Sequence, residues 1–148
     1  MNKHFFPYLA LMVVVIACPT FALDSIPLDQ LKPGLWKVER KIEKLDLTPV
    51  EYETRNSEYC ASPKKEITRT LQLAAFLCKT DTTKIADNQY RVDATCKLGL
   101  VAGTNTTIIT IISPGEYRAQ VDTIGTKFGE KQHRKEAISA VRAGDCQE

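Results

Sequence analysis

Short segments in which apolar and polar residues alternate recur along this chain, with turn residues between them. In 35–42, Trp36 and Val38 alternate with charged side chains. The same period of two recurs in 90–96 and 117–123, and it is the period of a β-strand with one buried face. Together with the β-branched content, the alternation predicts seven strands, over 35–42, 50–59, 79–85, 90–96, 104–112, 117–123 and 133–142.

One segment has helical spacing instead. Ser62 and Pro63 are typical of a helix start, because a serine side chain can cap the free amides and proline suits the first helical position. Apolar residues then recur every three to four positions, so the sequence predicts a helix over 63–77 that packs one face on a sheet. That face consists of Ile67, Leu71, Ala74 and Ala75.

These elements predict a mainly β fold in one domain, 23–148. Because short turns join most successive strands, we expect an antiparallel meander of about seven strands, curved or barrel-like, with the helix packed on it. The lead-in 24–33 is polar and contains proline, and the glycine-containing segments 99–103 and 125–129 interrupt the strand pattern.

The first 22 residues (1–22) have the pattern of an export signal peptide. A positively charged start precedes the apolar run 5–17, and a small-x-small cleavage site follows at 20–22. Cleavage before Leu23 would release a periplasmic or secreted protein. The alternative is a lipoprotein anchored through Cys18, because Val-Ile-Ala-Cys resembles a bacterial lipobox. No later stretch is apolar enough to span a bilayer.

The charge balance excludes some partners. The signal contains only Lys3 of the 20 lysines and arginines, so 19 basic residues face 18 acidic ones and the remaining net charge is +1. The densest basic cluster, within 127–136, is diluted by Glu130 and Glu136. A nucleic-acid partner is therefore not expected.

Four cysteines remain after either cut: Cys60, Cys78, Cys96 and Cys146. An even number in an exported chain predicts two disulfides. A zinc site is not indicated, because the spacings are 17, 17 and 49 intervening residues and His133 is the one histidine left.

Topology ranks the three possible cysteine pairings. Cys78 and Cys96 lie nine residues to either side of Asp87, so they face each other if a hairpin turns there. A 15-residue helix is about 22 Å long, roughly the length of a seven-residue strand, and can carry the chain from Cys60 at one end of a sheet to Cys78 at the other. Three further strands return it to the Cys60 end at Cys146. This favours Cys78–Cys96 with Cys60–Cys146; Cys60–Cys78 with Cys96–Cys146 is the alternative if the helix folds back.

Four short motifs resemble those of a known family. Residues 31–38 are similar to a "kPGLWev" opening, 59–63 to "qCvtP", 92–96 to "vtC" and 142–146 to "R-x-G-x-C". In this order, over 31–146, they resemble the Domain of Unknown Function 3617 family of small exported bacterial proteins. The resemblance implies an envelope location and the domain boundaries, but no activity. Many relatives are rich in methionine, whereas this mature chain has none, so thioether metal binding is not implied.

The sequence contains few of the residue patterns that catalysis needs. His133 lies among charged residues on a predicted strand, which is typical of a solvated position rather than of a general base. The serines lack a nucleophile-elbow pattern, and neither a C-x-x-C pair nor a phosphate-binding glycine loop is present. We therefore expect no enzyme, no cofactor and no metal. The alternative is an enzyme whose carboxylates come together only on folding.

Three residues are the candidates for lining a ligand site: Trp36, Tyr90 and Val92. Tyr52 and Tyr117 also fall on apolar strand faces, and Arg40 shares the face of Trp36, where it either ends the buried stretch or makes a polar contact in a cavity. We expect an exported, non-enzymatic envelope protein that binds a small apolar ligand or a protein partner. A filled core would instead favour an accessory role without a ligand.

Overall fold

The computed structural model describes residues 26–147, which form seven strands, one α-helix and a short 3-10 turn. The predicted signal peptide, its cleavage site and Cys18 lie outside the described residues. In chain order the elements are η2 (Leu28–Gln30), β1 (Gly34–Lys44), β2 (Glu51–Ala61), α1 (Pro63–Leu77), β3 (Cys78–Ala86), β4 (Gln89–Leu98), β5 (Val101–Ser113), β6 (Glu116–Lys127) and β7 (Glu130–Gly144).

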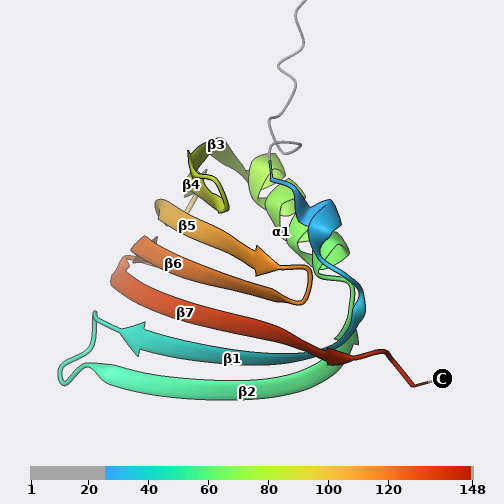
Figure 1. Cartoon of the computed structure of the whole chain (residues 1–148). Helices are drawn as coiled ribbons and strands as arrows, with labels where there is room; N and C mark the ends of the chain where they lie inside the picture. Colours follow the sequence, from blue (N-terminus) through green and yellow to red (C-terminus); the bar gives the residue numbers. More distant parts are fainter. Residues whose placement is uncertain (1–25, 148) are drawn as a thin grey trace, which may run out of the picture.

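All seven strands belong to one antiparallel sheet in the order β2-β1-β7-β6-β5-β4-β3. The sheet is curved and open, with β2 and β3 at its two edges (Figure 1). This confirms the predicted fold class, a mainly β antiparallel meander with one helix. The β1–β2 hairpin pairs with β7, and α1 carries the chain from one edge of the sheet to the other.

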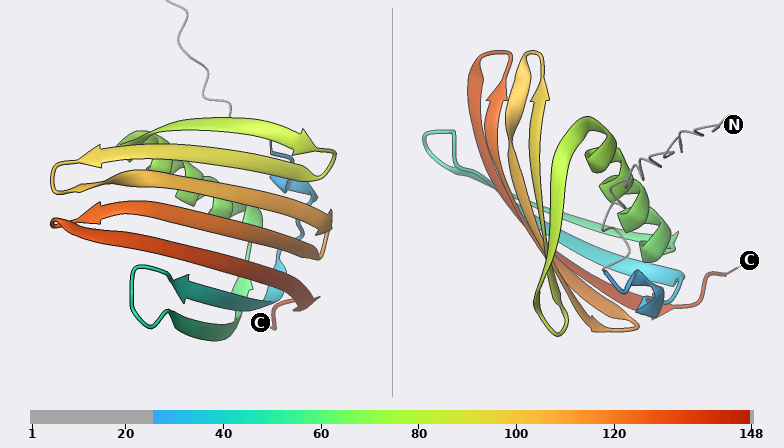
Figure 2. Two further views of the ribbon diagram at one scale, coloured as in Figure 1. Left: turned by 90° about the vertical axis from the view of Figure 1, so that its left-hand side faces the viewer. Right: turned by 90° about the horizontal axis from the view of Figure 1, so that it is seen from above.

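Helix α1 covers one face of the sheet and leaves the other bare (Figure 2). We call the covered face the inner face and the bare one the outer face. The helix spans Pro63–Leu77, as predicted, and Ile67 and Leu71 of its apolar side pack on the core. The predicted side-chain cap is absent: Ser62 makes no capping hydrogen bond, and its carbonyl accepts a bond from the Glu66 amide.

The sheet has two distinct ends. The apical end, on the left of Figure 1, carries the β1–β2, β4–β5 and β6–β7 turns. The C-terminal end of α1 leads into β3, whose first residue pairs with Cys96 close to the apical end of β4. The basal end carries the starts of β1 and α1 and the end of β7.

Both segments predicted as strand interruptions are wrong in part. The turns are only Gly99–Leu100 and Phe128–Gly129, so β5 begins at Val101 and β6 continues to Lys127. Gly103 and Gly125 lie inside these strands as a cross-strand pair. A Cβ atom at Gly103 would lie 2.8 Å from the Gly125 Cα, so here glycine permits a close approach of two backbones rather than a turn.

The hydrophobic core fills the basal part of the inner face. Trp36 is 1% exposed, and its ring centroid lies 5.7 Å from that of Tyr117. The lead-in, predicted to be polar, covers this core because it supplies three buried apolar side chains. They are Ile26, Leu28 and Leu31.

Two disulfides close the structure at opposite ends. Cys60–Cys146 joins the ends of β2 and β7 at the basal end, and Cys78–Cys96 joins the paired strands β3 and β4 near the apical end. These are the two pairs that the topological argument favoured. Disulfides persist in oxidising compartments, so they indicate a location outside the cytoplasm. Within 26–147, no helix is long and apolar enough to cross a membrane.

Candidate functional site

A cleft of about 460 Å³ lies between helix α1 and the inner face of the sheet. Its helix wall includes Ile67, Leu71 and Ala74, and the Cys78–Cys96 disulfide borders it toward the apical end. The sheet supplies the rest of its apolar wall from five strands. These residues are Val38, Ala94, Ile109, Tyr117, Ala119, Val121 and Ile138.

The inner face changes character along β5 and β7, which helps to explain where the cleft lies. Cross-strand partners in an antiparallel sheet share a face, so the register aligns this change from strand to strand. On these two strands the inward side chains are aliphatic near the basal end and become polar toward the apical end, whereas on β1 the inward Ile42 is 1% exposed. The sequence of inward side chains is Ile111, Ile109, Thr107 and Asn105 on β5, and Ala140, Ile138, Glu136 and Arg134 on β7.

A charged network forms the polar end of the cleft. The Glu136 side chain, 14% exposed, accepts contacts from two arginines: Arg40 Nη1 lies 3.5 Å from its Oε2, and Arg134 Nη2 lies 2.7 Å from its Oε1. Arg40 therefore makes the polar contact in a cavity that was one of its two predicted roles. Next to it, Arg55 lies directly opposite Arg40 in the sheet and pairs with Glu53.

This network has one positive charge in surplus, because three arginines face two glutamates. Among the described residues, the buried Nε atom of Arg134 has no hydrogen-bond partner. This donor lies behind the cleft, because Arg134 is not among the lining residues, whereas Arg40, Glu66 and Glu136 are. Arg40 therefore gives the polar end a guanidinium that can donate to an oxygen acceptor.

Two tyrosines line another part of the cleft, close to the start of α1. The Tyr59 hydroxyl donates to Glu66 Oε2 at 3.4 Å. Burial, and secondarily the negative charge of Glu66, raise the pKa of Tyr59. Burial also raises the pKa of Tyr117 to about 12, with smaller contributions from Tyr59 and Glu66. Both phenols thus stay protonated at neutral pH and keep their hydrogen-bond donors.

The three predicted ligand-lining residues lie in the packed core instead of the cleft wall. Trp36, Tyr90 and Val92 are buried in the core cluster, and none of the three lines the cleft. Alternation placed them on the correct face, but it did not reveal that the lead-in and Leu71 seal the basal part of that face. Of the other aromatic candidates, Tyr117 does line the cleft.

Tyr52 departs from its predicted interior position. It is 74% exposed, because β2 is an edge strand and the register sets Tyr52 opposite Glu43 on the outer face. The cleft residues that sequence reasoning missed include Tyr59 and Glu66. Their signal was weak, since β2 is polar along its length and the contact between these two residues depends on the angle at which α1 leaves the sheet.

His133 is not merely solvated, as the sequence suggested. Its Nε2 lies 3.0 Å from Asp122 Oδ1, and its amide donates to Asp46 Oδ1 at 3.3 Å. The His133 side chain is 34% exposed. Its partner Asp122 lies on the outer face of the sheet, away from the cleft wall. Within 26–147, no group of three or more His, Cys, Asp or Glu side chains is arranged to hold a metal ion.

The comparison with protein families finds the family that the four sequence motifs resemble, and the description of that family names no activity. The family described as "Protein of unknown function (DUF3617)" matches residues 31–146. No curated protein and no solved structure gives a significant match to this chain. The match begins before β1, ends at the last cysteine and spans most of the chain, including the cleft, so this protein belongs to the DUF3617 family.

Proposed function

We propose that this protein is an exported, non-enzymatic binding protein of the cell envelope. Its ligand is a small, largely apolar molecule that carries one anionic or acceptor group. The cleft under α1, which combines an apolar wall with one polar end, is the observation that supports this proposal.

The dimensions and lining of the cleft are those of a small-molecule site. Ligand pockets typically enclose about 300–1,000 Å³, and the volume here is about 460 Å³. Burying apolar ligand surface against Ile67, Ile109 and Ile138 would contribute about 25 cal/mol per Å². The apolar wall would thus supply affinity without requiring a specific shape.

The polar end of the cleft defines the second part of the ligand. Arg40 lines the cleft beside Glu136, and the other two arginines of the network, Arg55 and Arg134, lie outside the lining and pair with Glu53 and Glu136. A guanidinium favours carboxylate or phosphate oxygens, because it presents several donors in one plane. The neutral phenol of Tyr117 adds a donor, whereas Tyr59 donates its proton to Glu66.

Binding rather than turnover is favoured by the state of the cleft carboxylates. Glu136 is neutralised by two arginines, and Glu66 accepts the bond from Tyr59. A general base needs a free lone pair directed toward the substrate. An enzyme that uses these two carboxylates remains the competing hypothesis, and the experiment below also tests it.

The location in the envelope is part of the proposal. The export pattern of 1–22 and the two disulfides both support release into an oxidising compartment, the periplasm or the exterior. Intact-mass measurement distinguishes a chain that starts at Leu23 from one with a diacylglycerol on Cys18.

The test is to fill the cleft without changing its chemistry. Ala119 lies where the core cluster meets the cleft wall, and Ala119→Leu adds apolar volume there, so binding is compared in the folded fraction. Ala137 lies on the neighbouring strand and faces outward, so Ala137→Leu is the matched control. Binding of an environment-sensitive apolar fluorophore with a carboxylate group should weaken at least tenfold in Ala119→Leu and stay unchanged in Ala137→Leu.

Two measurements complete the test. Native mass spectrometry of the exported protein should show a co-purifying small molecule in the parent chain and lose it in Ala119→Leu. Equal probe binding by both variants would exclude the cleft as the site. A bound molecule that is chemically converted over time, with loss of conversion in Glu136→Gln, would favour the enzyme instead.

A further inference from the structure

Exposed hydrophobic side chains gather at the apical end of the sheet. The described residues include 15 exposed large hydrophobic side chains, and 11 of them lie at this end, on its turns, strand ends or the last part of α1. They are Leu47, Val50, Tyr52, Leu73, Phe76, Leu77, Leu98, Leu100, Val101, Ile124 and Phe128. Scattered exposed apolar residues are ordinary in soluble proteins, but a gathering at one end of a domain indicates an interaction surface.

Seven of these side chains lie on neighbouring elements, and we call them the apical patch. The β4–β5 and β6–β7 turns are joined, because the Phe128 amide donates to the Leu100 carbonyl at 2.9 Å. The Cys78–Cys96 disulfide ties the C-terminal end of α1 to the strand that leads into the first of these turns. The apical patch consists of Leu73, Phe76, Leu77, Leu98, Leu100, Val101 and Phe128.

The patch protrudes into solvent instead of folding back on the core. Phe76 is 85% exposed, and Leu100 and Phe128 are each 69% exposed. Leu100 and Phe128 occupy the tips of two-residue turns, where a polar residue would be the usual choice. Nothing in the fold of 26–147 requires these apolar tips, since their side chains contribute little to its core.

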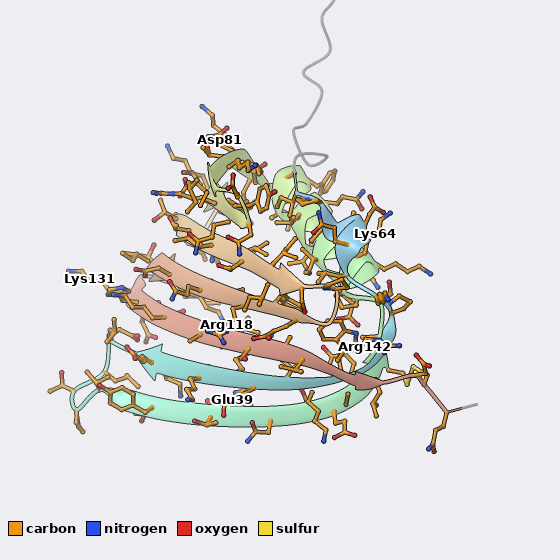
Figure 3. The ribbon with its side chains drawn as sticks, in the orientation of Figure 1. Glu39, Lys64, Asp81, Arg118, Lys131 and Arg142 are labelled. Carbon is orange, nitrogen blue, oxygen red and sulfur yellow. A yellow bond between two sulfur atoms is a disulfide. The ribbon has the colours of Figure 1, made fainter. Side chains whose placement is uncertain are left out.

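Lysines surround the patch, and they are free of ion pairs within the described part of the chain. Four lysines near the patch form no salt bridge there: Lys79, Lys97, Lys127 and Lys131. By contrast, Lys41 and Lys44 of β1 and Lys135 of β7 each form one. Glu130 and Asp46 also lie at this end, so these two residues and the four lysines near the patch together have a net charge of +2. Figure 3 shows Lys131 at this end and Arg142 at the opposite end.

We propose that the apical patch docks on the surface of an anionic lipid bilayer. Phe76, Leu100 and Phe128 would enter the boundary between headgroups and acyl chains, while the lysines contact lipid phosphates. The stems of the lysines tolerate this position, because they can lie along apolar surface with the ammonium group in water. This proposal does not depend on what the cleft binds.

A lipid surface fits this patch better than a protein surface does. The cores of protein interfaces are depleted in lysine and match a complementary shape, whereas this patch consists of protruding tips with lysines between and around them. A fluid anionic surface adapts to such tips and attracts each lysine within a Debye length. Self-association through the patch is the competing outcome, and the experiment includes it.

The experiment uses the exported chain with its mass determined, carrying Cys18→Ala so that no lipid can anchor it. Binding to phosphatidylglycerol–phosphatidylethanolamine vesicles is measured by flotation. The double variant Leu100→Asp with Phe128→Asp should bind at least tenfold more weakly. The matched control, Ile112→Asp with Val141→Asp, changes two exposed apolar residues near the basal end and should bind within twofold of the parent.

A second set of variants tests the charge contribution without touching the apolar tips. Lys97→Gln, Lys127→Gln and Lys131→Gln together should lower the affinity at least tenfold and reduce its dependence on salt. Vesicles of phosphatidylcholine alone should bind the parent at least tenfold more weakly than the anionic vesicles do.

Three results would overturn the proposal. They are the absence of vesicle binding by the parent, equal losses in the apical and basal variants, and a dimer in solution that the apical variants dissociate while vesicle binding is absent. The last result would assign the patch to a second copy of the chain.

Discussion

The two halves of the inner face are built from the same strands but differ in what covers them. In the basal half, the lead-in forms one buried cluster with Trp36, Tyr90 and Val92, none of which lines the cleft. In the cleft half, only α1 lies above the strands, and a space of about 460 Å³ remains. An open site in so small a domain thus depends on concentrating the core at one end, where it must supply most of the stability.

The inward side chains follow this division. Aromatic and aliphatic residues occupy the covered half, where burial of apolar surface stabilises the fold. Arg40, Glu136 and Arg134 occupy the far half, where solvent or a ligand can reach them. Changes in the basal half should therefore mainly alter stability, and changes in the cleft half should mainly alter binding.

The largest effect on the free energy of unfolding is expected from removal of the disulfides, one of which lies in each half. Replacing both Cys60 and Cys146 by serine should lower the free energy of unfolding by about 4.5 kcal/mol, against about 3 kcal/mol for Cys78 and Cys96, because the loops span 86 and 18 residues. Denaturant unfolding without reductant measures both. Equal losses would show that loop length does not set the difference.

The two cysteine replacements should also differ in their effect on the affinity for the cleft probe. Cys78 and Cys96 line the cleft, so their replacement should weaken probe binding in the folded fraction. Replacement of Cys60 and Cys146 should leave that affinity unchanged, since neither lines the cleft.

Trp36→Ala should be the most damaging single change in the basal half. Truncating this side chain leaves a cavity, and it removes the donor that its Nε1 presents to the Lys32 carbonyl at 3.2 Å. We expect a loss of about 3–5 kcal/mol in thermal or denaturant unfolding. Tyr52→Ala is the matched control, because this exposed aromatic residue should cost less than about 0.5 kcal/mol.

High pH should test Tyr117, which contacts both halves. Its pKa is raised to about 12 in the folded state, against about 10 in an unfolded chain, so the folded state keeps the proton longer. The stabilisation is complete below pH 10 and is lost as the pH rises toward 12, by about 2–3 kcal/mol in total. Tyr59, whose pKa is also raised, adds to this loss.

The measurement is the free energy of unfolding of the parent and of Tyr117→Phe across that pH window. Lysine deprotonation affects both proteins equally, so the difference between their slopes isolates the phenol. Parallel slopes would mean that Tyr117 titrates normally and that water reaches its hydroxyl.

The fold could be predicted from the sequence because its signals are local. Each signal is contained in one segment of the chain. The signals are the period-two alternation, the helix start at Ser62–Pro63, and the equal distances of Cys78 and Cys96 from Asp87. Strand boundaries failed at Gly103 and Gly125, where glycine serves a close approach of two strands rather than a turn.

The site could be predicted only in part because its boundary is not local. Trp36, Tyr90 and Val92 share the inner face with the cleft residues, and only the path of the lead-in decides which of them are sealed. The lead-in appeared polar because its three buried residues are separated by Pro27 and by the pair Asp29–Gln30. Arg40 did carry a usable signal, a charge on an otherwise apolar face.

The smallest effect is expected at His133, which belongs to neither half. It lies outside the cleft lining, and its contact with Asp122 is partly exposed, so the pair contributes at most about 1 kcal/mol even when the imidazole is charged. His133→Ala should therefore melt close to the parent and bind the cleft probe normally. It should also complement a deletion strain, whereas Ala119→Leu should not. A variant at His133 that folds and binds normally yet reproduces the deletion phenotype would contradict the binding proposal. It would make the His133–Asp122 pair, and not the cleft, the place to look for chemistry.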